Sequence, residues 1–128
     1  MIRNDNSTQA EPVVGWLVCV SGEHLGEDFS LKPGRNYIGR GNDNDIVISK
    51  DSAVSYDNKT VIIYEPEGRT FFAMPGEPEE ICCINGETVL SQREIWQNDK
   101  LTVGETVLMF IPCCGESFSW EGMQKQKP

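Results

Sequence analysis

The chain has 128 residues, which suffices for one domain with a hydrophobic core but not for two domains of ordinary size. It carries 11 Lys and Arg residues against 20 Asp and Glu residues, a formal net charge of -9, so its long-range field repels nucleic acid phosphates and anionic lipid headgroups. We therefore expect no nucleic acid partner and no membrane partner, and no apolar run approaches the length of a membrane-spanning helix.

The two ends of the chain differ from its middle. Residues 1–12 are polar, show no periodic apolar pattern and end in Glu11-Pro12, which predicts a disordered lead-in. Residues 122–128 are expected to form a flexible C-terminal tail. The start also lacks the apolar segment of a secretory signal, which indicates a cytoplasmic protein. The domain itself is expected to span residues 13–121.

Short apolar runs rich in β-branched and aromatic residues recur along this domain, with turn residues between them. This pattern predicts an all-β protein, folded as a sandwich or a barrel, with Trp16, Cys19 and Met109 in its core. Asn85-Gly86, between Ile84 and Thr88, is the strongest hairpin signal, while residues 91–97 are compatible with one helical turn. The expected strands occupy residues 13–20, 36–39, 46–48, 60–64, 70–73, 81–84 and 106–111.

The five cysteines cannot all form disulfides with one another, so we expect reduced thiols. Cys82-Cys83 and Cys113-Cys114 are adjacent pairs, and in a strand each pair points one sulfur to the core and one to solvent. Zinc sites usually separate paired cysteines by two residues, so no metal site is expected.

A search for catalytic motifs finds none. His24 is the only histidine and lies in the Gly-rich segment 21–26, so we expect an exposed loop residue there. Gly39-Arg40-Gly41 lacks the third glycine of a dinucleotide site. Residues 42–45 lack the glycine and the closing glutamate of a calcium loop, and are expected to form a turn whose side chains bond local backbone amides. We predict a protein that is not an enzyme and uses no cofactor.

Basic and hydroxyl side chains do gather in one strand–turn–strand region. Arg40 ends one expected strand, Lys50 and Ser55 occupy the long loop after the next, and Lys59 opens the strand that follows. Arginine can hold a phosphate through two parallel hydrogen bonds, and a serine hydroxyl and loop amides can complete the cradle. In an acidic chain these residues predict an anion site. The alternative is that they are unrelated surface residues.

Five motifs follow one another along the chain. They are Gly34-Arg35-Asn36-Tyr37-Ile38-Gly39-Arg40, Asn44-Asp45-Ile46-Val47-Ile48, Asp51-Ser52-Ala53-Val54-Ser55, Ile84-Asn85-Gly86-Glu87-Thr88-Val89-Leu90 and Asn98-Asp99-Lys100-Leu101-Thr102-Val103-Gly104. Their order and approximate spacing resemble the forkhead-associated (FHA) domain, over roughly Val13 to Trp120. The resemblance, to a divergent bacterial-type single-domain member, implies a twisted two-sheet β-sandwich of about eleven strands. It also implies an adaptor in Ser/Thr kinase signalling that binds phosphothreonine peptides through loops at one end of the sandwich.

The resemblance assigns roles to single residues. Arg40 resembles the family's phosphate-binding arginine, and Gly39 before it lets the strand end turn toward the ligand. Ser55 resembles the serine that donates to the phosphate, and Lys50 adds positive charge. The implied partner is a phosphothreonine-containing protein or peptide, such as a Ser/Thr kinase or its substrate. Thr8, once phosphorylated, is a candidate for self-interaction with the same site.

The chain also departs from the family pattern. The family has a histidine three positions after its serine, whereas this chain has Asn58 there and Lys59 next. Either Asn58 replaces the hydrogen bonds of that histidine or Lys59 turns toward the phosphate, and no histidine is expected to brace the site. Glu79 and Glu80 stand close to the family's Thr-Asn, where they would repel a phosphothreonine.

These departures leave an alternative open. Asn85 and Gly86 match a later Asn-Gly of the family that serves a hairpin turn rather than the ligand. The alternative is a degenerate FHA domain that acts as a phospho-independent protein-interaction scaffold, with the aromatic side chains of Trp96, Phe118 and Trp120 as evidence of its surface.

Overall fold

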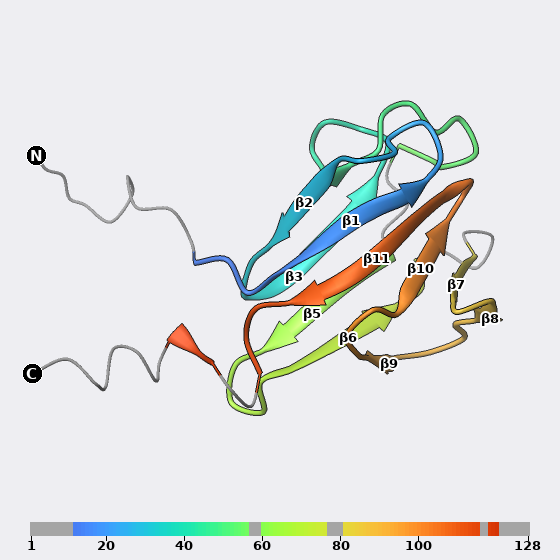
Figure 1. Cartoon of the computed structure of the whole chain (residues 1–128). Coiled ribbons are helices and arrows are strands. Elements are labelled where there is room, and N and C mark those ends of the chain that lie inside the picture. The colour runs from blue at the N-terminus through green and yellow to red at the C-terminus, as the bar shows by residue number, and fades with distance from the viewer. Residues whose placement is uncertain (1–11, 57–59, 77–80, 116–117, 121–128) are drawn as a thin grey trace, which may run out of the picture.

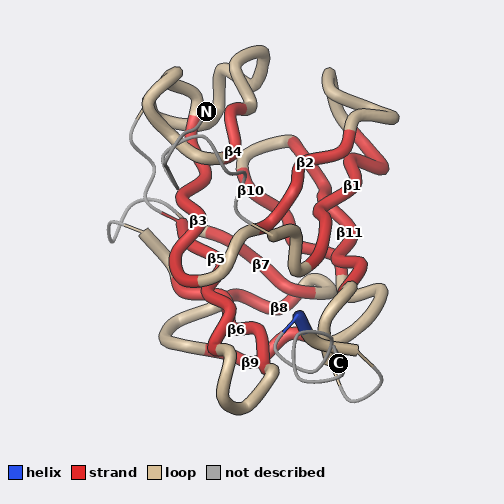
Figure 2. The backbone as a smooth tube through the Cα atoms, turned by 90° about the vertical axis from the view of Figure 1, so that its left-hand side faces the viewer, coloured by secondary structure: helices blue, strands red, loops and turns tan. Residues whose placement is uncertain are grey.

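The computed structural model describes residues 12–56, 60–76, 81–115 and 118–120, and its strands pack as two layers (Figures 1 and 2). The expected all-β sandwich of about eleven strands is confirmed. The expected lead-in and tail fall almost wholly on residues 1–11 and 121–128, outside the described residues. The strands are β1 (Gly15–Ser21), β2 (Asp28–Leu31), β3 (Gly34–Gly39), β4 (Ile46–Val47), β5 (Thr60–Glu65), β6 (Thr70–Met74), β7 (Cys82–Ile84), β8 (Glu87–Thr88), β9 (Arg93–Ile95), β10 (Lys100–Val103) and β11 (Thr106–Pro112).

One sheet has six strands in the order β2-β1-β11-β10-β7-β8, and the other has five in the order β4-β3-β5-β6-β9. In the described part of the chain the pairing of β3 with β4 is parallel and the other pairings are antiparallel. Over the same residues, no helix is long and apolar enough to cross a membrane.

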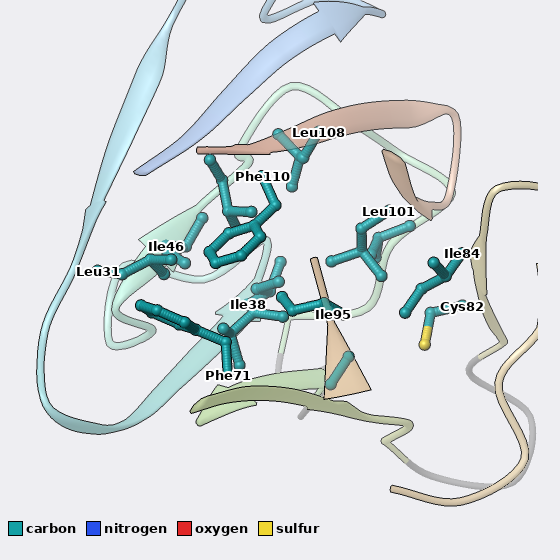
Figure 3. Close-up of a cluster of buried hydrophobic side chains, with 14 of the residues drawn as sticks. Leu31, Ile38, Ile46, Phe71, Cys82, Ile84, Ile95, Leu101, Leu108 and Phe110 are labelled. Carbon is teal, nitrogen blue, oxygen red and sulfur yellow. The ribbon is translucent and has the colours of Figure 1, made fainter. Parts of the chain in front are cut away.

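The core lies between the two sheets and is filled from both (Figure 3). Leu17 of β1 pairs with Phe110 of β11, and both side chains point inward. The Phe110 ring meets Phe71 of the opposite sheet edge-on, with 4.6 Å between the ring centroids. Each such side chain stabilises the fold by about 1.5–3 kcal/mol relative to an exposed one.

The core prediction is wrong for two of its three residues. Cys19 is buried, but Trp16 and Met109 are only half-buried, on the outer face of the six-stranded sheet. Successive side chains of a strand point to opposite faces, so the inward positions of Leu17 and Cys19 turn Trp16 outward.

The turn and cysteine predictions can be compared with the same strands. The hairpin at Asn85-Gly86 is confirmed, because it joins β7 to β8 with φ values of 52° and 85°, the paired positive angles of a type I′ turn. The prediction of a helical turn at 91–97 is wrong, because β9 lies there and pairs with β6. This strand is too short for its sequence to show a strand pattern. In each cysteine pair one residue is buried and the other half-buried, and none of the five cysteines forms a disulfide. Burial, together with the neighbouring Cys83, raises the pKa of Cys82 to about 11.

Gly104 provides a test of the packing at the β10–β11 turn. Its φ is +60°, and a Cβ there would lie 2.5 Å from Val54 Cγ2 and 2.8 Å from Asp51 Oδ2. We expect Gly104→Ala to lose at least ~1 kcal/mol more stability than Gly86→Ala, because overpacking adds to the strain of the left-handed backbone. Gly86 is the matched control, since its φ is +85° with no atom within 4 Å of the added Cβ. Urea denaturation of the two variants measures the difference, and equal losses would contradict the packing.

Candidate functional site

Four loops meet at one end of the sandwich (Figures 1 and 2). They are the loops β1–β2, β3–β4 and β4–β5 and the β10–β11 turn. Hydrogen bonds between loops confirm this arrangement: Arg40 N donates to the Ser55 carbonyl, and Glu105 N donates to Asp51. Residues that are distant in the sequence therefore lie close together at this end of the sandwich.

The β3–β4 loop has to be unusually compact. Parallel strands normally need a crossover of a dozen or more residues, yet only residues 40–45 separate β3 from its parallel neighbour β4. The Asn44 side-chain amide closes this loop by donating to the carbonyl of Gly41 at 2.9 Å and to that of Tyr56 at 2.6 Å. The second bond also joins the β3–β4 loop to the β4–β5 loop.

The same contacts explain Gly39. A Cβ at this position would lie 2.5 Å from Asn44 Nδ2 and 2.7 Å from the Tyr56 carbonyl oxygen. Gly39 does not have a positive φ. A glycine is therefore required here because the two loops approach each other closely. The sequence instead indicated that Gly39 serves a turn at the end of the strand.

The polar turn at residues 42–45 agrees with its prediction in part. The Asp45 carboxylate accepts a hydrogen bond from the Tyr37 backbone amide at 2.8 Å, as expected of a side chain that caps backbone amides. Asn44 instead donates to carbonyl groups, one of them 12 residues away. The run of Asn and Asp residues contained no signal for that long-range bond.

Arg40 is half-buried directly after β3 and is held on two sides. Its Nε donates to the Val54 carbonyl at 2.7 Å, and its guanidinium carbon lies 4.2 Å from the centroid of the Tyr56 ring. The carbonyl bond and the cation–π contact fix the plane of the guanidinium. No carboxylate of the described residues lies within 4.0 Å of it. An oriented cation is thus available for an anion from outside.

The other predicted site residues divide into two groups. Ser55 and Lys50 are exposed, and Ser55 directly follows the carbonyl that holds Arg40. Asn58 and Lys59 lie outside the described residues, as do the acidic pair Glu79 and Glu80 and the candidate tail residue Thr8.

Asp51 anchors the β4–β5 loop to the opposite sheet. The residue is 5% exposed, and its carboxylate accepts hydrogen bonds from Ala53 N at 3.0 Å, Glu105 N at 2.8 Å and Thr106 Oγ1 at 2.6 Å. Burial raises the pKa of Asp51, but the hydrogen bonds, led by the Thr106 hydroxyl, outweigh it, and the pKa is lowered from its ordinary value of 3.8. The carboxylate is therefore ionised in the folded protein at neutral pH.

The prediction of an exposed His24 is wrong. His24 is 3% exposed, and its Nε2 accepts a hydrogen bond from the Lys50 backbone amide at 3.1 Å. Backbone bonds from Leu25 to Gly22 and from Gly26 to Cys19 fold the β1–β2 loop tightly and turn the imidazole inward. Two glycines with positive φ in this loop, at 113° and 91°, were the available sequence signal, because they permit such a fold.

The aromatic residues considered for a scaffold surface lie away from Arg40. Trp96 follows β9, is 63% exposed and lines a cavity of about 650 Å³ together with residues 68–70 of the β5–β6 turn. This turn lies at the end of the sandwich opposite the four loops (Figure 1). Phe118 packs against the core, and the Trp120 indole nitrogen donates to the Val13 carbonyl at 2.6 Å. Across the described ranges, no group of three or more His, Cys, Asp or Glu side chains could hold a metal ion.

Comparison with known proteins identifies the fold. No family model matches the sequence, and no curated protein matches it either. Among solved structures, the FHA domain of an Arabidopsis thaliana hypothetical protein superposes with a TM-score of 0.69 and 20% identity, covering 91% of this chain and 100% of that one. The N-terminal FHA domain of Saccharomyces cerevisiae Rad53p, in complex with a phosphothreonine peptide, gives a TM-score of 0.67 and 17% identity, covering 78% and 94%.

A third solved structure comes from a secretion system. The cytoplasmic domain of the sorting platform protein PscD from Pseudomonas aeruginosa gives a TM-score of 0.66 and 17% identity, covering 78% of this chain and 81% of that one. The protein therefore has the FHA fold, as its motifs implied. Identities at this level show the fold alone, so function has to be argued from the site.

Asp51→Asn tests the anchor. The amide would place an NH₂ group where the carboxylate accepts, and we expect a loss of about 1–3 kcal/mol at pH 7. The folded-state pKa lies below the unfolded one, so the stability from ionised Asp51 is complete above the ordinary value of 3.8 and is lost as the pH falls through the folded-state value. Urea titrations at several pH values should show the gap between wild type and variant closing below that point. Asp43→Asn, at an exposed position, is the control, and a gap that does not change with pH would refute the role of the charge.

Proposed function

We propose that the protein is a non-enzymatic binding module that recognises phosphothreonine peptides at the loop end of the sandwich. The observation that carries this proposal is the Arg40 guanidinium, which is oriented by the Val54 carbonyl and the Tyr56 ring without a described carboxylate as partner. The Rad53p FHA domain, which has the same fold, binds a phosphothreonine peptide, and this supports the proposal.

The surrounding groups suit a phosphate. Arginine offers five donors in a planar fork, and among the described residues only the Val54 carbonyl accepts from the Arg40 side chain, at Nε, so the terminal nitrogens can make a bidentate contact. The exposed Ser55 hydroxyl donates a further bond, and Lys50 contributes charge from the same loop. Asn58 and Lys59 complete the proposed site, although they lie outside the described residues. Contacts to the threonine methyl then discriminate against phosphoserine.

The partner class follows from the ligand. A phosphothreonine arises from a Ser/Thr kinase, so the proposed partner is such a kinase or one of its substrates, with phosphorylated Thr8 as a candidate internal ligand. Five cysteines without a disulfide suit a reducing compartment, which supports the proposal that the protein is cytoplasmic.

Arg40→Ala tests the proposed function directly. We titrate the purified full-length chain with a peptide library that holds a central phosphothreonine in degenerate flanks, and with its unphosphorylated twin. Loss of charge-assisted hydrogen bonds worth about 1.5–3 kcal/mol should weaken phosphopeptide binding roughly tenfold or more. Arg35→Ala is the matched control, because it removes the same charge from an exposed position five residues earlier on β3, and should bind within about twofold of wild type.

Either of two outcomes would contradict the proposal. One is binding that does not depend on the phosphate, and the other is phosphate-dependent binding that Arg40→Ala leaves intact. In the first case the scaffold alternative takes its place, and the surface around Trp96 becomes the region to probe.

A further inference from the structure

A buried histidine links the β1–β2 loop to the loop that holds Arg40. His24 lies in the first of these loops, and its Nε2 accepts the backbone hydrogen of Lys50 in the second, at 3.1 Å. The two residues are 26 positions apart in the sequence. The imidazole is nearly inaccessible at 3% exposure, and its ring packs edge-on against Phe29 of β2, with 6.3 Å between the ring centroids. The hydrogen bond between His24 and Lys50 therefore joins two loops and is not part of either sheet.

The direction of the hydrogen bond defines the tautomer of His24. A backbone N–H can only donate, so Nε2 has to be the unprotonated nitrogen and the ring proton is on Nδ1. Nδ1 lies 3.2 Å from the Glu27 carboxylate, close enough for electrostatic attraction although not aligned for a hydrogen bond. The negative charge of Glu27 favours the proton on that side of the ring. Both neighbours therefore select the same form of the imidazole.

The contact fixes the start of the loop that positions the site. Lys50 N is held by His24, and the next residue, Asp51, is held by Glu105 N and the Thr106 hydroxyl. Within the following turn, the carbonyls of Val54 and Ser55 accept from the side chain and the backbone of Arg40. A displacement of residues 50 and 51 would therefore also displace the carbonyl groups that hold the Arg40 guanidinium.

We propose that His24 is a positioning residue of the phosphate site, which holds the β4–β5 loop in its binding conformation through the Lys50 amide. This inference rests on the proposed function for its effect on ligand affinity. The chain has no histidine after Ser55, and here a histidine from a different loop supplies the brace. The role requires a hydrogen-bond acceptor at Nε2 rather than an aromatic ring as such.

The first measurement uses the free wild-type chain and no ligand. In the ¹⁵N-labelled protein, a scalar coupling across the hydrogen bond between Lys50 N and His24 Nε2 is expected, with His24 as the Nδ1-protonated tautomer. An Nε2-protonated ring, or the absence of any such coupling, would overturn the inference whether or not the protein binds peptides.

The second measurement compares two variants in the full-length chain. His24→Phe keeps an aromatic ring but removes the acceptor, whereas His24→Gln keeps an acceptor oxygen. With the phosphothreonine library as probe, we expect the Phe variant to bind about five- to tenfold more weakly and the Gln variant to recover to within about twofold of wild type. Glu23→Gln, at an exposed position of the same loop, is the control and is expected to bind like wild type.

The readouts separate positioning from general stability. Urea denaturation is run on each variant, and equal weakening of binding by Phe and Gln would overturn the proposal. If the Phe variant does not fold, the Gln variant and the wild-type coupling still decide the question. If wild type binds no phosphothreonine peptide, the proposed function fails, and hydrogen exchange at the Lys50 and Arg40 amides then reports directly on the loop. Faster exchange in the Phe variant alone would support positioning, and unchanged exchange would refute it.

Discussion

The buried carboxylate of Asp51 is the interaction on which the loop end depends. Asp51 belongs to the β4–β5 loop, which connects strands of the five-stranded sheet. Its carboxylate accepts hydrogen bonds from Glu105 N and the Thr106 hydroxyl, at the β10–β11 turn of the six-stranded sheet. A charge buried to this extent is tolerable only because its oxygens are hydrogen-bonded, so its surroundings cannot rearrange without a large cost in free energy. Gly104 belongs to the same constraint, because no side chain larger than hydrogen fits beside Asp51 and Val54. The loop is thereby fixed to the rigid core rather than to its own strand ends alone.

From this anchor the order of the site follows step by step. Fixing residue 51 fixes the carbonyls of Val54 and Tyr56, which accept from Arg40 and Asn44, and Asn44 closes the short loop between the parallel strands β3 and β4. The arginine is held by main-chain carbonyls and an aromatic ring rather than by a carboxylate. Its positive charge is consequently not neutralised within the described part of the chain. The side chain loses its conformational entropy when the protein folds, so this loss does not weaken ligand binding. Preorganisation without neutralisation is the property that an anion site requires.

The sequence predicts the fold well where the information is local, in apolar runs and turn residues. Apolar runs rich in β-branched and aromatic residues identify the central strands β1, β5 and β11, and Asn85-Gly86 identifies its hairpin because both positions have to adopt positive φ. Edge strands such as β9 contain too few inward residues to leave a pattern. Arg40 was predictable because it ends a strand within an ordered set of motifs. The hydrogen-bond partner of His24 was not, because it is a backbone amide 26 residues away, and an amide has no residue type that a sequence can reveal.

Long-range and short-range electrostatics act in opposite directions at this site. The chain carries a net charge of -9, so a doubly negative phosphothreonine is repelled at a distance. At physiological ionic strength this field decays over about 8 Å, while a charge-assisted hydrogen bond to Arg40 would act at about 3 Å. Added salt should therefore remove the distant repulsion before it weakens the contact itself. An acidic protein with a cation oriented in this way binds a phosphate more slowly at low salt but keeps the direct contact. Its overall charge therefore does not argue against a ligand with one phosphate, in contrast to the many phosphates of a nucleic acid.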